Sequence, residues 1–225
     1  MFTYKYPHPA VTTDCVVFGF DGSALNLLLI QRGIDPYRGA WALPGGFMNI
    51  DETAEQGALR ELQEETGVKD IYIEQLQAFT TVDRDPRERV LTIAFLAFVR
   101  QENYELLAGD DAAQARWFPV TDLPELAFDH QEIIRVALDR LRWKITYQPL
   151  AFRLLNHTFT MTQLQTIYEV VLGQSFDRRN FHKKMMALGY ITPTDQVARQ
   201  NGRPGTLYSF DEGKYEEWVS SRSGI

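Results

Sequence analysis

Three glutamates, Glu61, Glu64 and Glu65, stand three and four residues apart in one stretch of the chain. If the stretch is helical, its carboxylates share one face, because residues at these spacings are neighbours on a helix. Like charges so close repel one another unless a cation lies between them. Hard divalent ions take oxygen ligands, and Mg²⁺ commonly shares its coordination shell with substrate phosphates. The spacing therefore predicts a site for Mg²⁺ or Mn²⁺ that faces a phosphorylated ligand.

The residues around the glutamates are suited to holding this array in place. Arg60 precedes Glu64 by four residues and can pair with it or with Glu52. Gly45 and Gly46 allow the preceding loop to fold close to the start of the helix, where backbone carbonyl groups become available. The competing interpretation is a solvated acidic helix face that binds nothing.

The stretch from Gly46 to Val68 resembles the Nudix box, which reads Gly, five residues, Glu, seven residues, then Arg-Glu-aliphatic-x-Glu-Glu-x-Gly-aliphatic. Every fixed position of the pattern matches. In that superfamily a metal-activated water attacks a phosphorus of a pyrophosphate. The resemblance implies that the metal ligands are Glu61, Glu64, Glu65 and the carbonyl of Gly45, and that Glu64, Arg60 and Glu52 form the catalytic set, with Arg60 and Glu52 orienting the helix. The general base is Glu64 or a later carboxylate, for which Asp110 and Asp111 are candidates unless they form a solvated turn.

Arginines elsewhere in the first half are candidates for gripping a phosphate. Arg84, Arg87 and Arg89 lie close together between two expected strands, and Arg32 ends an earlier strand. Because the guanidinium fork binds phosphate oxygens in pairs, we predict that these four residues bind the substrate. Acidic residues alternate with the first three, so a local ion-pair turn is the alternative.

The elements that must position these residues follow from the apolar pattern. Strands are expected at 10–20, 26–32, 71–82, 89–100 and 116–118. One helix is expected from the capping residue Thr53 to Gly67, and another at 129–145. Asp129 is expected to cap the second helix, which leaves catalysis by His130 as a weaker interpretation. The order fits the α+β class and the α/β/α sandwich with a mixed sheet that the resemblance implies.

The character of the chain changes near residues 147–149, and we place a boundary there between domains 1–147 and 148–225. The first holds 14 Lys and Arg against 23 Asp and Glu, whereas the second holds 9 against 7. In the second domain, helices at 160–171 and 177–186 are followed by a hairpin with a basic tip at 199–204. Two helices around a glycine-containing turn, the second one basic, are typical of a winged helix-turn-helix. The alternative is a helical lid or a dimerisation module.

The second of these helices and the hairpin tip supply the candidate DNA contacts. The residues are Arg178, Arg179, Asn180, Lys183, Lys184, Arg199 and Arg203. A Nudix domain followed by a winged helix resembles the NrtR-type transcriptional regulators over nearly the whole chain. In such regulators the Nudix domain senses an ADP-ribose-type ligand, often with a degraded box. The intact box here predicts that ADP-ribose pyrophosphatase activity is retained.

These features predict a protein that is both a hydrolase and a regulator, and a non-catalytic sensor of ADP-ribose or a sugar metabolite is the alternative. A double-stranded DNA operator with paired half-sites implies a homodimer. No apolar run reaches the roughly 18 residues that a membrane span needs, and the first residues lack a secretory signal. The single cysteine, Cys15, lies in an apolar run and is expected in the core. A cytoplasmic location is therefore expected.

Overall fold

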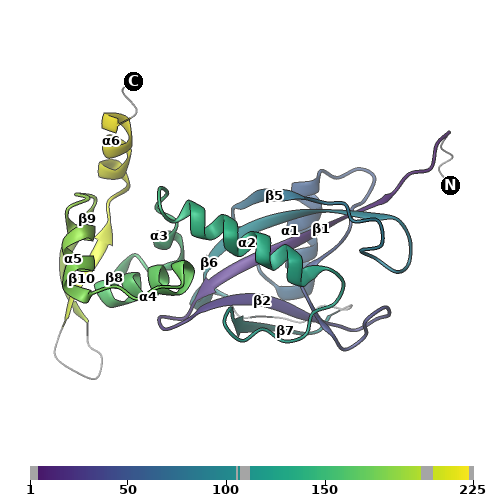
Figure 1. Ribbon diagram of the computed structural model, residues 1–225, viewed down its shortest axis with the longest axis horizontal. Helices are drawn as coiled ribbons and strands as arrows, with labels where there is room; N and C mark the ends of the chain where they lie inside the picture. Colours follow the sequence, from purple (N-terminus) through teal and green to yellow (C-terminus); the bar gives the residue numbers. More distant parts are fainter. Residues whose placement is uncertain (1–4, 105, 107–111, 199–204, 223–225) are drawn as a thin grey trace.

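The structure is a computed structural model, and it describes residues 5–104, 106, 112–198 and 205–222. Figure 1 shows two parts: a sheet with helices on both faces, and a smaller group of helices and strands beside one end of the sheet. The chain ends beyond helix α6, which projects away from the sheet.

The larger part is built on a mixed sheet. Its strands are β1 (Ala10–Phe20), β2 (Leu25–Arg32), β3 (Trp41–Ala42), β4 (Gly45–Phe47), β5 (Ile73–Phe79), β6 (Val90–Arg100) and β7 (Ala112–Pro119), and a short 3-10 helix, Gln101–Asn103, follows β6. Strands β1 and β6 are parallel along their whole length, while the other pairs of this sheet are antiparallel. The order is β3-β2-β1-β6-β5, with β4 on β1 and β7 on β2. The expected strand at 116–118 was too short, because β7 pairs along most of β2.

Helices cover the two faces of this sheet. Helix α1 (Ala54–Thr66) begins at Thr53, which forms a capping box with Gln56, and ends at left-handed Gly67, as expected. Its buried residues Ala58 and Leu62 pack on the face to which Cys15, Val17 and Phe95 point. Helix α2 (His130–Lys144) packs on the opposite face through Ile133, Ile134, Ala137 and Leu141, beside Val16 and Phe18. Alternate residues of β1 thus pack into two cores, one on each face of the sheet. The α/β/α sandwich is confirmed.

Cys15 is completely buried in the core beneath α1. Burial, reinforced by the nearby Asp14 carboxylate, raises the pKa of its thiol. A thiol that stays protonated is a poor nucleophile, so Cys15 is a core residue, as expected.

The smaller part is a winged helix. It contains α3 (Ala151–Leu154), β8 (Thr158–Thr160), α4 (Met161–Leu172), α5 (Arg178–Met186), β9 (Ile191–Ala198), β10 (Gly205–Phe210) and α6 (Glu212–Arg222). Thr160 forms a capping box with Gln163 at the start of α4, and Asp177 caps α5. Strands β8, β10 and β9 form an antiparallel sheet. The two helices and the hairpin were expected, whereas α3, β8 and α6 were not. Elements as short as α3 and β8 carry little periodicity. The hairpin tip, 199–204, lies outside the described residues.

The two parts share one apolar core. Leu141 and Ile145, at the end of α2, belong to the same buried cluster as Leu164 and Ile167 of α4. Polar contacts join the parts as well, since Arg100 Nε donates to the carbonyl of Leu155 at 2.6 Å. Our proposed boundary at 147–148 falls between α2 and α3. In the described part of the chain, no helix is both long and apolar enough to span a membrane.

Candidate functional site

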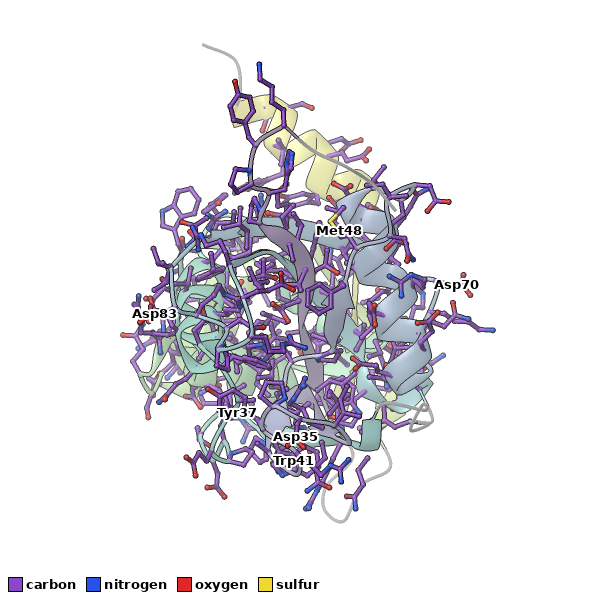
Figure 2. The ribbon with its side chains drawn as sticks, turned by 90° about the vertical axis from the view of Figure 1, so that its right-hand side faces the viewer. Asp35, Tyr37, Trp41, Met48, Asp70 and Asp83 are labelled. Atoms are coloured by element: carbon purple, nitrogen blue, oxygen red, sulfur yellow. The ribbon has the colours of Figure 1, made fainter. Side chains whose placement is uncertain are left out.

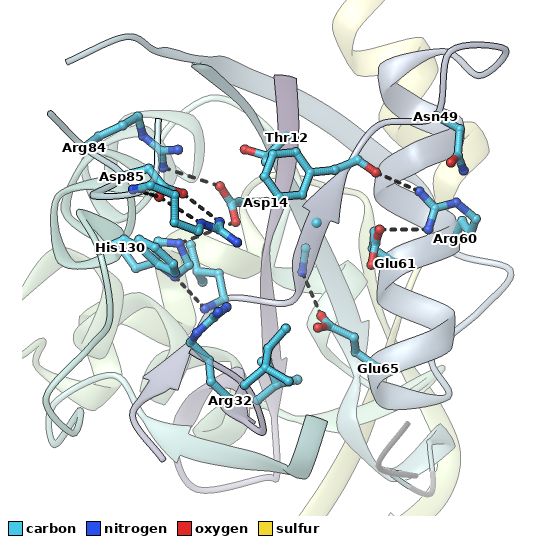
Figure 3. A pocket seen from close by; sticks show the side chains of 18 residues that line it. Thr12, Asp14, Arg32, Asn49, Arg60, Glu61, Glu65, Arg84, Asp85 and His130 are labelled. Atoms are coloured by element: carbon cyan, nitrogen blue, oxygen red, sulfur yellow. Dashed lines mark hydrogen bonds and ion pairs between the residues drawn. The ribbon is translucent and has the colours of Figure 1, made fainter. Parts of the chain in front are cut away.

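A cleft of about 260 Å³ opens at the end of the sheet where α1, β4 and the start of α2 meet. Figure 2 shows the loops around this end, among them those that carry Tyr37, Met48 and Asp83. Figure 3 shows the lining: Arg60, Glu61 and Glu65 project from α1 on one side, Arg32, Arg84 and His130 lie on the other, and Asp14 lies between them. The cleft therefore has an acidic wall and a basic wall.

The acidic wall consists of α1 and the glycines of β4. Glu65 Oε2 accepts a hydrogen bond from the backbone N–H of Gly45 at 2.8 Å. A Cβ on Gly46 would lie 2.5 Å from the Glu61 carboxylate, so a side chain there would collide with it. Burial raises the pKa of Glu65 to about 8 and also raises the pKa of Glu61. Two desolvated carboxylates with raised pKa values form a site that favours a cation.

Arg60 holds the box carboxylates in place. Its Nε and Nη2 atoms donate to Glu52 at 3.0 and 2.7 Å, and its Nη1 donates to Glu61 at 2.8 Å. The hydrogen bonds from Arg60 lower the pKa of Glu52 to about 2. A further bond from Nη2 to the carbonyl of Phe47, at 3.1 Å, ties the helix to the preceding loop. These contacts suit the orienting role that the sequence predicts for Arg60 and Glu52.

Glu64 differs from its neighbours on the helix. Its side chain is 59% exposed and pairs with Arg60 Nη1 at 3.1 Å, whereas Glu61 and Glu65 line the cleft. Among the described residues, no three Asp, Glu, His or Cys side chains converge closely enough to hold a metal ion. The expected convergence of all three box carboxylates is thus not present in this arrangement, since Glu64 lies outside the cleft lining. Arg60 Nη1 lies between Glu61 and Glu64 and binds both. Asp110 and Asp111 lie outside the described residues.

The basic wall contains three of the four predicted arginines. Arg32, Arg84 and Arg87 line the cleft. Arg89 does not, because its guanidinium donates to the carbonyls of Thr80 and Thr81 at 2.9 Å and closes its own loop. Substrate binding by Arg89 is therefore not supported, and its structural role matches the alternative of a local turn.

Arg84 and Arg87 are each paired with an acid within the wall. Arg84 is buried and binds Asp129 through two hydrogen bonds, of 2.9 and 2.6 Å. Arg87 Nη2 donates to Asp85 at 2.7 Å. Arg87 thus forms the local ion pair of the alternative interpretation, whereas Arg84 pairs with a distant acid. Both arginines also face the cleft, so substrate binding stays a prediction.

An aromatic ring that sequence reasoning missed lies among the arginines. The guanidinium carbon of Arg32 lies 4.8 Å from the centre of the Phe128 ring, and that of Arg87 lies 5.7 Å from it. Tyr37 packs edge-on against the same ring at 4.8 Å. Phe128 has a positive φ of 53°, which turns its side chain into the cleft just before α2. No periodicity marks a single residue in such a conformation.

Buried polar residues form the floor of the cleft. Asp14 accepts a hydrogen bond from Thr92 Oγ1 at 2.6 Å, and its Oδ1 lies 3.5 Å from His130 Nε2. The backbone N–H of Leu43 donates to His130 Nδ1 at 2.9 Å, so the proton of a neutral ring is on Nε2. Burial lowers the pKa of His130 and keeps the ring neutral. Asp14 was missed, because it stands in an apolar strand without a motif.

A second groove lies on the winged helix. It has a volume of about 820 Å³ and is lined by the first residues of α4 and α5 and by β10, among them Arg178, Arg179 and His182. Asn180 and Lys184 line a different groove, behind α5, and Lys183 is exposed. Arg199 and Arg203 lie outside the described residues. The structure thus brings Arg178 and Arg179 together on the surface where a winged helix would meet DNA.

A mixed sheet between two helices, with the box carboxylates and arginines at one cleft, defines a Nudix domain. The model of the NUDIX domain family matches residues 8–139, and the chain belongs to that family. A second model, the NrtR DNA-binding winged helix domain, matches residues 151–210. The chain is therefore a Nudix protein of the NrtR type, in which the Nudix domain is joined to a winged helix.

Similar proteins match all or part of this chain. The ADPR responsive transcriptional repressor NtrR of Acinetobacter baylyi is 34% identical over 94% of this chain and 86% of its own length. The ADP-ribose pyrophosphatase of Methanocaldococcus jannaschii is 42% identical over 62% of this chain and 77% of its own. The crystal structure of Shewanella oneidensis NrtR complexed with a 27mer DNA is 32% identical, has a TM-score of 0.73, and covers 92% of this chain and 95% of that one.

Proposed function

We propose that this protein is an ADP-ribose-responsive transcriptional regulator whose Nudix domain also hydrolyses ADP-ribose or a similar nucleoside-diphosphate compound. The main support for this proposal is that one cleft has an acidic wall, with Glu61 and Glu65, and a basic wall, with Arg32 and Arg87. A pyrophosphate suits such a cleft, because a cation on the carboxylates and the guanidinium groups would bind its oxygens from opposite sides. The names of the relatives from A. baylyi and M. jannaschii support ADP-ribose as the ligand.

The residues present fit a divalent cation such as Mg²⁺ or Mn²⁺. Glu61, Glu65 and the carbonyl of Gly45 offer only oxygen donors, which hard cations prefer. Burial raises the pKa of both carboxyl groups, and a cation bound between them would favour their charged forms. Glu64 would complete the set if it left Arg60. A bound divalent ion would neutralise phosphoryl oxygens and lower the pKa of a coordinated water.

The chain's own side chains would then orient the substrate. The ring of Phe128, with Arg32 and Arg87 packed against it, offers an aromatic and cationic surface for a base or ribose. Arg60 and Glu52 fix the direction of α1 and with it the positions of Glu61 and Glu65. The general base is proposed to be Glu64, one of the candidates that the Nudix resemblance implies, once it leaves its pair with Arg60.

A second candidate is a sensor that binds ADP-ribose without cleaving it. The observation that favours it is the 3.1 Å pair between Glu64 and Arg60, which holds the proposed base on an arginine and outside the cleft lining. Both candidates share the ligand, and they differ only in turnover.

The winged helix is proposed to bind a double-stranded DNA operator. Arg178 and Arg179 lie at the start of α5, the position from which a recognition helix contacts DNA, and Lys183 is exposed one turn later. A homodimer is proposed on symmetry grounds, because paired recognition helices match palindromic half-sites. The DNA complex of the S. oneidensis relative supports DNA as the partner.

The proposal is tested by incubating the protein with ADP-ribose and Mg²⁺ and measuring released AMP. Glu64→Gln is expected to lower the rate by about 100-fold or more, the range seen when general base catalysis is lost. Glu55→Gln, which removes an exposed carboxylate of the same helix, is the matched control. Binding of ADP-ribose without release of AMP would eliminate the hydrolase and support the sensor. The absence of binding would eliminate both candidates.

A further inference from the structure

Helix α2 begins at the cleft. Its first residue, His130, lies in the cleft floor, and Asp129 stands at the N-cap position before it. An aspartate at this position normally accepts hydrogen bonds from the backbone N–H groups of the first helical turn. Asp129 makes no such bond, because its carboxylate is bound by Arg84 through both oxygens, at 2.9 and 2.6 Å.

The Asp129 carboxylate therefore has two alternative partners. Its backbone, at φ −96° and ψ 20°, is outside the extended region typical of a capping residue. The N–H of Glu132, which a capping carboxylate would bind, donates instead to the backbone carbonyl of Asp129 at 2.9 Å. The side chain cannot hold Arg84 and cap α2 in this conformation at the same time. A switch between the two would change the backbone at the start of the helix.

Arg84, although buried, is the member of this pair that lines the cleft. Its Nη2 lies 3.7 Å from Asp14 as well as 2.6 Å from Asp129. A phosphate competes well with a carboxylate for a guanidinium group, because both offer paired oxygens. If Asp129 is displaced, Arg84 keeps a charged neighbour in Asp14 and is not left buried without a partner.

The far end of α2 contacts the winged helix. Arg142 Nε donates to the carbonyl of Val171, in the last turn of α4, at 3.2 Å. Leu141 belongs to the same apolar cluster as Leu164 of α4. Helix α2 spans about 21 Å at 1.5 Å per residue. Figure 1 shows α2 running along the sheet toward α3 and α4. A movement at Asp129 would therefore reach the DNA-binding part through one rigid helix.

We propose that Arg84 and Asp129 form a ligand-operated latch between the cleft and the winged helix. An anionic nucleotide that binds Arg84 releases Asp129, the carboxylate then caps α2, and the helix moves against α4. This inference rests on the proposed function, since it needs a phosphorylated ligand in the cleft. A ligand shifts such an equilibrium only if it binds one state more tightly, and competition for Arg84 supplies that difference.

The test compares DNA affinity with and without ADP-ribose for the full chain, using an operator selected from random double-stranded DNA. The ratio of the two dissociation constants measures the coupling, which is typically about 5- to 150-fold for allosteric proteins. In Asp129→Asn, which can still cap a helix but cannot form the ion pair, we expect the ratio to fall to about 2 or less. Because Arg84 is already released, ADP-ribose should bind this variant more tightly than the wild type.

Glu132→Gln is the matched control, because it removes an exposed carboxylate from the same helical turn. It is expected to keep the wild-type ratio. Arg84→Lys keeps the charge but loses the paired donors, and it should also lower the ratio, so the test does not depend on one variant folding. If both latch variants keep the wild-type ratio of dissociation constants, the proposed latch is wrong, whereas the proposal of an ADP-ribose-responsive regulator is still supported. If the wild type binds DNA and ADP-ribose but shows no coupling, the regulator and the latch both fail.

Discussion

The backbone N–H of Gly45 donates to the carboxylate of Glu65 at 2.8 Å. This bond joins strand β4 to helix α1 across twenty residues of chain, and it fixes one edge of the acidic wall. Strand β4 also pairs with β1. A movement of β4 would therefore displace both the sheet edge and the helix α1. The metal site proposed here depends on this close approach of a strand and a helix.

Gly46→Ala is expected to disrupt the acidic wall. The new Cβ would lie 2.5 Å from the Glu61 carboxylate, so the carboxylate must leave its position. We expect the affinity for Mn²⁺ to fall by about tenfold, or about 1.4 kcal/mol, because the Glu61 carboxylate no longer lies where the cation would bind. Titration with Mn²⁺ followed by calorimetry measures the effect. The control is Gly213→Ala, where an added Cβ would lie 3.6 Å from Asp211, an ordinary contact. Equal Mn²⁺ affinity in the two variants would contradict the proposed role of Glu61.

The buried His130 should make the stability depend on pH. Burial lowers the pKa of His130 below its ordinary value of 6.5, so below that pH the unfolded chain takes up a proton that the folded chain does not. Its contribution to stability is therefore fully present above pH 6.5 and is lost as the pH falls toward the folded pKa.

In His130→Asn, which can still accept the bond from Leu43, the free energy of unfolding should fall less steeply below pH 6.5. The difference in slope is at most about 1.4 kcal/mol per pH unit, the value for one proton. Urea unfolding between pH 5 and 7.5 measures it, with His157→Asn on an exposed side chain as the control. A slope unchanged by His130→Asn would show that burial of this ring is not the cause.

Phe128→Ala should weaken ADP-ribose binding. The guanidinium groups of Arg32 and Arg87 pack against this ring, and removing it takes away the aromatic surface offered to the ligand. Stacking on an aromatic side chain contributes about 1–3 kcal/mol per base, so the dissociation constant should rise by about tenfold. Calorimetry with ADP-ribose gives the value. Tyr72→Ala, which removes an exposed ring elsewhere, is the control. If Phe128→Ala binds as tightly as Tyr72→Ala, the ligand does not use this ring.

Replacing Arg178 and Arg179 together by alanine should weaken DNA binding and reduce its salt dependence. Each phosphate contact that is lost should lower the slope of log affinity against log salt by about 0.9, because fewer counterions are released. Fluorescence anisotropy over a range of salt concentrations measures the slope. Arg135→Ala, on the exposed face of α2, is the control for loss of a positive charge. A slope equal to the wild type in the double variant would remove these residues from the DNA contact.

Features that depend on neighbours in the chain were predictable. The spacing of Glu61, Glu64 and Glu65, the caps at Thr53 and Gly67, and the basic face of α5 follow from helical geometry and short-range hydrogen bonds. The fold class followed from the order of periodic segments together with the Nudix resemblance. The strong pattern over 46–68 was informative because its positions interact with one another within one short stretch, as Arg60 does with Glu52 and Glu64.

Tertiary structure decided what the cleft contains. Arg84 and Asp129 are 45 residues apart, and Asp14 and Thr92 are 78 apart, so no local rule could pair them. Because Asp129 pairs with Arg84, its side chain does not form the cap that the sequence predicted. The sequence by itself determined which residues can do chemistry and on which helix they lie. Only folding determined which charges face one another, because a charged side chain binds the partner that the packed backbone places beside it.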